Sequence, residues 1–242
     1  MVGVVKRRLK RSQILVSAVQ SARSTAIRHA GRRKRRGIIN ACLAAAGTKK
    51  LQLGAGGNDL DGWLCSDLFP QPHEIYVDVT ERLPFPDRTF DYVFSEHQIE
   101  HVPYPYGVFM LHECFRVLKP GGVLRIATPD LERIVALYAA EKSDLQQRYI
   151  RFVTDKFIPE TSDYSPCFVV NCDVRSWEHQ FIYDFATLAQ EMHRAGFVEV
   201  TRHAAGESGD VALRGLEAHG RVIGDEEMNA YETMAVEARR PA

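Results

Sequence analysis

Short apolar runs alternate with amphipathic segments from residue 49 to the end of the chain, and this alternation constrains the fold more than any other feature. Strands that alternate with helical crossovers form parallel sheets. We therefore predict an α/β fold with a seven-stranded, mostly parallel sheet, helices on both faces, and a last strand pair that is antiparallel. The predicted strands are 50–53, 64–68, 74–78, 92–95, 123–127, 198–203 and 232–238, and the predicted helices are 37–46, 108–117, 131–140 and 185–195.

A glycine-rich turn follows the first predicted strand, within residues 51–58 (LQLGAGGN). Glycine lets the backbone turn tightly and approach a bound ligand closely. Asp67 and Asp78 close the next two predicted strands, where a carboxylate can accept hydrogen bonds from ribose hydroxyls or from an adenine amino group. Ligands of open α/β sheets bind at these strand ends, so the three features together predict a nucleoside-containing ligand. Taken singly, each is equally compatible with a structural turn or a helix cap.

The charge is divided unevenly along the chain. Residues 1–50 contain 14 Lys and Arg and no Asp or Glu, so residues 51–242 hold the remaining 17 basic and all 31 acidic side chains, a net charge of −14. We predict a basic N-terminal arm (1–36), with a weakly amphipathic helix within 12–30, and a domain over 37–242. Residues 141–180 lack clear periodicity and are predicted to form an inserted lid.

The basic arm has several possible roles. It can remain a solvated extension, be attracted to an anionic membrane surface or to nucleic acid, or dock on the acidic domain of its own or a neighbouring chain. No aromatic residues interleave its basic residues, so it carries no specific signal for nucleic acid.

The chain has no apolar run of about 20 residues, the length needed to span a membrane. Its five cysteines form no CxxC pair, which is typical of reduced thiols. We therefore expect a cytoplasmic protein, peripheral at the inner membrane face if the arm binds lipid.

Several segments resemble the signatures of class I, S-adenosylmethionine-dependent methyltransferases. Residues 83–91 (LPFPDRTFD) and 116–122 (RVLKPGG) carry the most specific resemblance. In detail the chain is similar to an uncharacterised bacterial subgroup, through residues 62–68 (GWLCSDL), 95–101 (SEHQIEH) and 124–131 (LRIATPDL). The resemblance runs from about residue 49 to 138, and more weakly to residue 240.

The resemblance implies a Rossmann-like fold and transfer of a methyl group from S-adenosylmethionine to an oxygen or nitrogen atom of a small-molecule or glycan acceptor. It suggests a role in tailoring cell-surface glycans. Gly54 and Gly56 would face the methionine and ribose portion of the cofactor, Asp67 the ribose, Asp78 the adenine end, and Ser95 the sulfonium. The full set of implied cofactor residues is Gly54, Ala55, Gly56, Asp67, Leu68, Asp78, Val79, Ser95 and Glu96.

Two positions depart from the family pattern. Gln52 stands where many members have an acidic residue, and Asn58 stands where many have a third glycine. These departures leave open a non-catalytic, cofactor-binding or membrane-associated scaffold. A nicotinamide-dependent oxidoreductase is a further alternative, although the dinucleotide fingerprint requires the missing third glycine. The short distance from Gly54 to Asp67 also predicts a truncated first helix.

Residues 97–101 (HQIEH) match an inverted zinc-protease pattern, H-x-x-E-H. On a helix, His97 and His101 would share one face and could bind zinc with Glu100 nearby, which makes a zinc hydrolase a minor alternative. We expect no metal here. His97 and His101 are instead candidate general bases, because imidazole titrates near neutral pH.

In the downstream half, residues 177–184 (WEHQFIYD) also match the subgroup. Asp184 is predicted to cap the helix at 185–195. His179 can either reach the acceptor pocket or pack within the lid.

Overall fold

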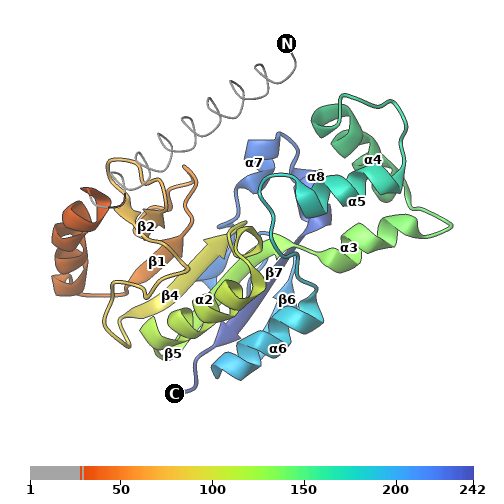
Figure 1. The fold of residues 1–242 in the computed structure, drawn as a ribbon. Helices are drawn as coiled ribbons and strands as arrows, with labels where there is room; N and C mark the ends of the chain where they lie inside the picture. Colours follow the sequence, from red (N-terminus) through yellow and green to blue (C-terminus); the bar gives the residue numbers. More distant parts are fainter. Residues whose placement is uncertain (1–27, 29) are drawn as a thin grey trace, which may run out of the picture.

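The structure, a computed structural model, describes residue 28 and residues 30–242. Seven strands in this part of the chain form one sheet in the order β3-β2-β1-β4-β5-β7-β6 (Figure 1). The strands from β3 to β5 in this order are parallel, whereas β7 is antiparallel to both β5 and β6. The predicted Rossmann-like α/β fold and its antiparallel last pair are confirmed. The bounds are β1 Lys50–Leu53, β2 Leu64–Asp67, β3 Ile75–Tyr76, β4 Phe90–Glu96, β5 Leu118–Pro129, β6 Val198–His203 and β7 Thr233–Arg239.

Most helices of the described residues follow β4. Helices α2 and α6 pack against each other and against the sheet, where their apolar side chains join the main core (Figure 1). Asp184 accepts a hydrogen bond from the backbone N–H of Thr187, and Gly196 ends α6 at a φ of 107°, so the predicted cap and helix are confirmed. The bounds are α2 Tyr104–Val117, α3 Leu131–Val135, α4 Asp144–Phe157, α5 Pro166–Arg175, α6 Phe185–Ala195, α7 His219–Ile223 and α8 Glu226–Glu232, with 3₁₀ turns η1 Ile99–His101, η2 Ala136–Tyr138 and η3 Val211–Leu213.

The connection from β1 to β2 contains turns and no helix, over residues 54–63. The sequence predicted a truncated helix in this connection, but the structure has no helix there. The glycine turn therefore leads directly into the neighbouring strand.

Residues 30–44 form one helix, which crosses the expected boundary between arm and domain at residue 36. Ile39 on this helix is buried in the main core. Its basic side chains contact the domain as well, because Arg32 bonds to Glu81 and Arg35 donates to the carbonyl of Tyr76 at 2.9 Å. The docking alternative therefore holds for this part of the arm. The helix expected within 12–30 lies outside the described residues, apart from residues 28 and 30.

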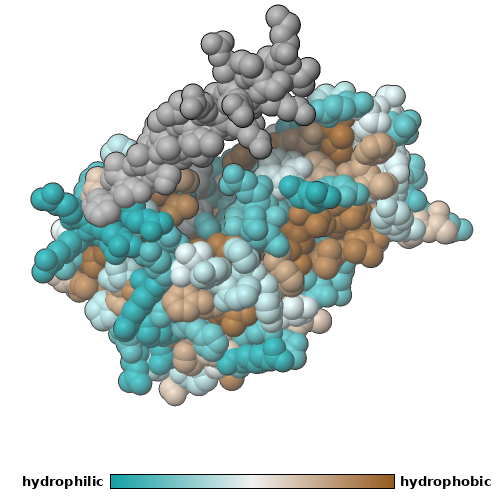
Figure 2. Space-filling model, viewed as in Figure 1, coloured by the Kyte–Doolittle hydropathy of each residue, from teal (hydrophilic) through white to brown (hydrophobic). Residues whose placement is uncertain are grey.

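Residues 141–180 are more regular than the sequence indicated. Ser143 and Gln146 form a capping box at the start of α4, and α4 buries Tyr149, Ile150 and Val153 in a second, smaller core shared with α5 and α8. Figure 2 shows hydrophobic surface over α5 and α3. Val135 of α3 and Phe168 and Val174 of α5 have exposed side chains.

The two signature segments are joined by Arg116, which lies within the second of them. Its guanidinium donates to the carbonyls of Phe85 and Leu83, at 2.8 and 3.0 Å, and to the carboxylate of Glu113. Glu113 also accepts a hydrogen bond from the backbone N–H of Leu83 at 2.7 Å. These segments therefore have a structural role, since they fix the turn before β4 against the end of α2.

None of the helices among the described residues is long and apolar enough to cross a membrane. The five cysteines are unpaired, and Cys65, Cys114 and Cys172 are buried.

Candidate active site

The turn after β1 is held in place by Gln52, which is almost completely buried. Its amide nitrogen donates to the carbonyl of Asn58 at 2.7 Å, and its amide oxygen accepts from the backbone N–H of Leu60 at 3.2 Å. A carboxylate could not donate the first of these bonds. Gln52 is therefore suited to fixing the shape of the glycine turn.

Gly54 and Gly56 have φ angles of 69° and 56°, in the left-handed region that favours glycine. A Cβ at Gly54 would lie 2.1 Å from the side-chain oxygen of Gln98, whereas a Cβ at Gly56 would meet nothing closer than 4.0 Å. Gly54 thus allows Gln98 to pack against the turn, and Gly56 leaves open space beside it.

Asp67 lies at the end of β2 beside the glycine turn, where its carboxylate accepts from the backbone N–H groups of Gly56, at 3.1 Å, and Phe69, at 2.8 Å. Leu68 follows it and is exposed. Asp78, beyond β3, accepts from the hydroxyl and N–H of Thr80 and lies 3.7 Å from Arg28. Val79, the next residue, is buried in the core.

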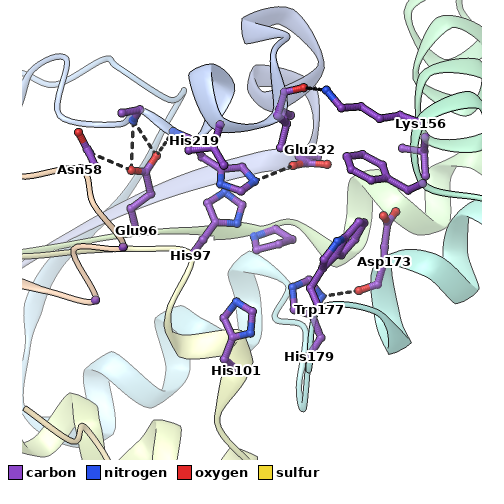
Figure 3. A pocket seen from close by; sticks show the side chains of 18 of the residues that line it. Asn58, Glu96, His97, His101, Lys156, Asp173, Trp177, His179, His219 and Glu232 are labelled. Carbon is purple, nitrogen blue, oxygen red and sulfur yellow. Dashed lines mark hydrogen bonds and ion pairs between the residues drawn. The ribbon is translucent and has the colours of Figure 1, made fainter. Parts of the chain in front are cut away.

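A cavity of about 370 Å³ extends from the glycine turn to the α4–α5 region (Figure 3). Gly54, Ala55, Gly56 and Glu96, four of the expected cofactor residues, line it together with both base candidates, His97 and His101. Asp67, Leu68, Asp78, Val79 and Ser95 are not among the lining residues, and Ser95 is fully buried within β4.

Glu96, at the end of β4, holds the start of α7. One carboxylate oxygen accepts from the backbone N–H groups of Ala218 and His219, both at 2.9 Å, and the other lies 3.4 Å from the amide of Asn58. Burial raises the pKa of Glu96 in spite of these bonds. Glu96 therefore connects the glycine turn, β4 and α7.

His97 is fixed on both sides of its ring. Nδ1 lies 3.1 Å from a carboxylate oxygen of Glu100, and Nε2 lies 3.2 Å from the hydroxyl of Thr233. Burial alone would lower the pKa of His97, but the Glu100 carboxylate outweighs burial and raises it. Burial likewise favours the neutral form of Glu100, but His97 outweighs it and lowers the pKa of Glu100. The two residues form a buried, charge-stabilised pair.

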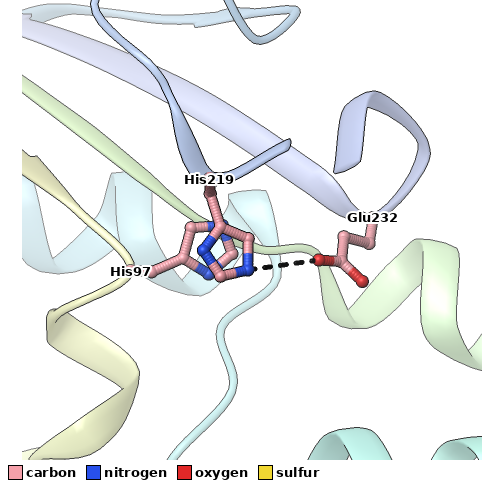
Figure 4. A group of neighbouring side chains, drawn as sticks. All are labelled: His97, His219 and Glu232. Carbon is pink, nitrogen blue, oxygen red and sulfur yellow. Dashed lines mark ion pairs between the residues drawn. The ribbon is translucent and has the colours of Figure 1, made fainter. Parts of the chain in front are cut away.

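His219 stacks on His97, with ring centroids 3.8 Å apart and planes inclined at 21° (Figure 4). Its Nε2 lies 4.0 Å from Glu232, which also accepts a hydrogen bond from the hydroxyl of Tyr149. Burial, together with the charge of His97, lowers the pKa of His219 to about 3. Burial raises the pKa of Glu232 and of Asp173, which faces Tyr149 from α5.

His101 has a different set of neighbours. Its ring lies 4.8 Å from that of His179, whose Nδ1 contacts the carbonyl of Asp173. Burial lowers the pKa of His179.

The zinc-protease pattern assumed a helix through His97 and His101, but η1 is a single 3₁₀ turn and His97 precedes it at a φ of 44°. The two histidines therefore do not share the helical face that the zinc-hydrolase alternative required.

Several residues of this site had no assigned role in the sequence analysis. Glu232 was the first residue of a predicted strand, and His219 lay in a segment without an assigned function. Asp173 and Lys156 lay in the predicted lid, where no side chain had been given a role. The outer wall of the cavity is mostly apolar and comes from α4, α7 and the segment after α5, through Val153, Phe157, Trp177, Val222 and Ile223. No local periodicity or motif links these positions to the glycine turn.

Comparisons with known proteins agree with this architecture. Residues 64–126 match the methyltransferase domain family. A demethylmenaquinone methyltransferase of a Geobacillus species is 31% identical over 121 residues, which are 49% of this chain and 46% of that protein. A probable methyltransferase of Aspergillus luteorubrus is 38% identical over 95 residues, 38% of this chain and 32% of that protein. The chain thus spans less than half the length of these curated relatives.

Among solved structures, a SAM-dependent methyltransferase from Archaeoglobus fulgidus is similar over 88% of this chain and 94% of its own, with a TM-score of 0.46 and 16% identity. The family match covers β2 to the middle of β5, and so includes Asp67 and both signature segments. Residues 64–126 are therefore similar to the methyltransferase domain family, within a Rossmann-like sheet.

Proposed function

We propose that the protein transfers a methyl group from S-adenosylmethionine to an oxygen or nitrogen atom of an acceptor that enters the cavity from the α4–α5 side. One observation carries this proposal. A single cavity joins the glycine turn, where a class I cofactor would bind, to a cluster of histidines and carboxylates beneath an apolar wall.

The residues around the glycine turn fit the cofactor. Gly56 leaves open space beside its backbone, and Asp67 places a carboxylate at the neighbouring strand end. Each oxygen of Asp67 accepts one backbone hydrogen bond and keeps a further acceptor position, as two ribose hydroxyls require. The cofactor supplies both the methyl group and its leaving group, so the protein contributes mainly positioning and exclusion of water.

The acceptor part of the cavity favours a molecule with a flat or apolar face. Phe157 and Trp177 stand in its wall with ring centroids 5.0 Å apart. A sugar ring has such a face, which agrees with the glycan acceptor that the sequence resemblance suggests. A quinol ring has one as well, and the Geobacillus relative is by name a demethylmenaquinone methyltransferase.

His101 is the better candidate for a general base. Nδ1 of His97 faces the Glu100 carboxylate and Nε2 faces the Thr233 hydroxyl, so His97 is less accessible to an acceptor proton than His101 is. His101 lines the cavity without a comparable pair of contacts among the described residues. A base is needed only when the acceptor atom must lose a proton, as a hydroxyl must.

Calorimetry tests the cofactor assignment. We expect the protein to bind S-adenosylhomocysteine and not NAD, and Asp67→Asn to weaken that binding more than tenfold, since charge-assisted hydrogen bonds contribute about 1.5–3 kcal/mol each. Asp61→Asn, at a nearby exposed position, is the matched control. Binding of NAD alone would refute the proposal, and unchanged affinity in Asp67→Asn would move the ribose contact elsewhere.

Turnover distinguishes an enzyme from a cofactor-binding scaffold. Labelled S-adenosylmethionine should transfer its methyl group to glycan or quinol acceptors in a direct screen, and His101→Gln should slow transfer to hydroxyl acceptors while leaving cofactor affinity unchanged. Tight cofactor binding without transfer to any acceptor would favour the scaffold.

A further inference from the structure

Three side chains from distant parts of the chain converge beneath the cavity. His97 follows β4, His219 begins α7 and Glu232 ends α8 (Figure 4). Each offers one ligand atom, and these three atoms lie within 4.8 Å of one another. From this geometry we infer that His97, His219 and Glu232 form a binding site for Zn²⁺.

The donor set suits this ion. Two imidazoles and one carboxylate, with a fourth position left for water or substrate, are a known ligand combination of catalytic zinc. Tetrahedral zinc with bonds of about 2.0–2.2 Å places its ligand atoms about 3.3–3.6 Å apart. Because the rings of His97 and His219 are stacked, binding requires the two rings to turn until a nitrogen of each points at the ion, with the donors moving inward by about 1 Å. All three residues line the cavity, so the open position would face the acceptor.

The surroundings of His97 are those of a metal ligand. A ligating histidine usually gives its other ring N–H to a carboxylate or carbonyl, which fixes the ring and increases its basicity. Nδ1 of His97 faces the carboxylate of Glu100, which is itself buried and accepts a hydrogen bond from Thr128 at 2.9 Å. Nε2 is thereby left as the nitrogen for the ion.

The contacts of Nε2 are compatible with either a proton or a metal ion on this nitrogen. The hydroxyl of Thr233 donates to the side-chain oxygen of Asn229 at 3.1 Å, so it turns a lone pair toward Nε2, 3.2 Å away. In the neutral form of His97, the form that binds a metal, a proton on the Nδ1 that faces Glu100 leaves a lone pair on Nε2 as well. Two facing lone pairs repel each other unless a proton or a metal ion lies between or beside them.

A second group of possible ligands lies nearby and serves as an internal comparison. Glu100, His101 and His179 also bring one ligand atom each within 4.8 Å of one another. Glu100 is buried, however, and does not line the cavity, so this group offers an ion less access. The site that we infer is independent of methyl transfer and can be tested by binding alone.

The test is titration of chelator-treated full-length protein with ZnCl₂, followed by calorimetry and by the absorption spectrum of the Co²⁺-substituted form. We expect one equivalent to bind, and His219→Gln and Glu232→Gln to reduce the affinity at least 100-fold. His179→Gln, from the second group, is the matched control and should bind as the wild type does. Circular dichroism and S-adenosylhomocysteine binding establish that each variant is folded.

Two results would overturn the inference. Folded wild-type protein that binds no zinc would assign a proton, and not a metal, to Nε2 of His97. Zinc binding that is lost in His179→Gln and retained in His219→Gln would place the ion in the second group.

Discussion

At the scale of single residues, the shape of the glycine turn depends on the side-chain amide of Gln52 and on the absence of a side chain at Gly54. Gln52 stands where the family resemblance led us to expect an acidic residue, and its amide both donates and accepts in holding the glycine turn. Gly54 is constrained by its own φ and by Gln98, which fills the space where a side chain would begin. The sequence predicted that glycine was required at this turn, but not that Gln98 was one of the reasons.

Gly54→Ala should reduce affinity for S-adenosylhomocysteine at least tenfold, because the new Cβ would strain the backbone at a φ of 69° and displace Gln98. Combining it with Gln98→Ala should restore part of the affinity by removing the clash and leaving only the strain. Gly57→Ala is the control, since its φ is 88° but nothing lies within 4 Å of its Cβ. Calorimetry measures the affinity of the wild type and of the three variants for S-adenosylhomocysteine. A double variant that binds no more tightly than Gly54→Ala would exclude the clash with Gln98 as the cause.

At the scale of elements, the two signature segments prove to be one structural unit. Arg116 and Glu113, on the last turns of α2, bind the backbone of residues 83–85 and hold the turn that leads into β4. Helices α4 and α5 likewise form a unit with α8, around a core separate from that of the sheet. The unit of α4, α5 and α8 contributes part of the cavity wall, whereas the unit around Arg116 contributes no lining residue and only fixes the turn before β4.

Glu113 makes this unit sensitive to acid. Burial alone would raise its pKa, but Arg116 and the N–H of Leu83 outweigh burial and lower it. A carboxyl with a lowered pKa in the folded state contributes stability above its unfolded pKa of about 4.3, and that stability is lost as the pH falls through the folded pKa. Glu113→Gln should therefore cost about 1–3 kcal/mol of unfolding free energy at pH 7 and much less near pH 3.

Urea unfolding of wild type and Glu113→Gln across this pH range measures the difference. Glu141→Gln, at an exposed position, should follow the wild-type curve throughout. A cost of Glu113→Gln that stays constant with pH would show that the carboxylate charge contributes nothing to the stability of this unit.

At the scale of the whole molecule, basic residues near the N-terminus pair with acidic residues of the domain. Part of the basic arm belongs to the domain, since residues 30–44 form a helix whose side chains reach both the core and acidic groups near β3. Gly31 lies against Tyr76, where an added Cβ would come within 2.5 Å of the tyrosine Cβ, so the helix packs closely. The arm available for an external partner is therefore shorter than the sequence indicated.

We expect residues 1–27 to attract the protein to anionic membranes. They hold six basic and no acidic side chains, and each basic residue near an anionic bilayer can gain about 1 kcal/mol, an attraction that salt screens. Full-length protein should sediment with phosphatidylglycerol vesicles at low salt and not at high salt, whereas a form lacking residues 1–27 should stay in solution. Vesicles of phosphatidylcholine are the control, and equal sedimentation of both forms would exclude this role of the arm.

Local features of the sequence determined much of the fold. Apolar alternation located the strands, glycine marked the turn after β1, and Asp184 marked the start of α6, because each of these signals lies within a few residues of the structure that it specifies. The insertion at 141–180 was harder to predict, since α4 and α5 bury their apolar side chains against α8 and not against the sheet.

Only the tertiary structure brought His97, His219 and Glu232 together. Because β7 is antiparallel to β5, its first residue, Thr233, pairs with Pro129 at the carboxyl end of β5, and Glu232 arrives beside the end of β4. His219 comes to the same place because Glu96 binds the first N–H groups of α7. The contacts of Glu96 with His219 and of His97 with Thr233 join residues more than 120 positions apart, a distance over which neither periodicity nor a short motif carries information.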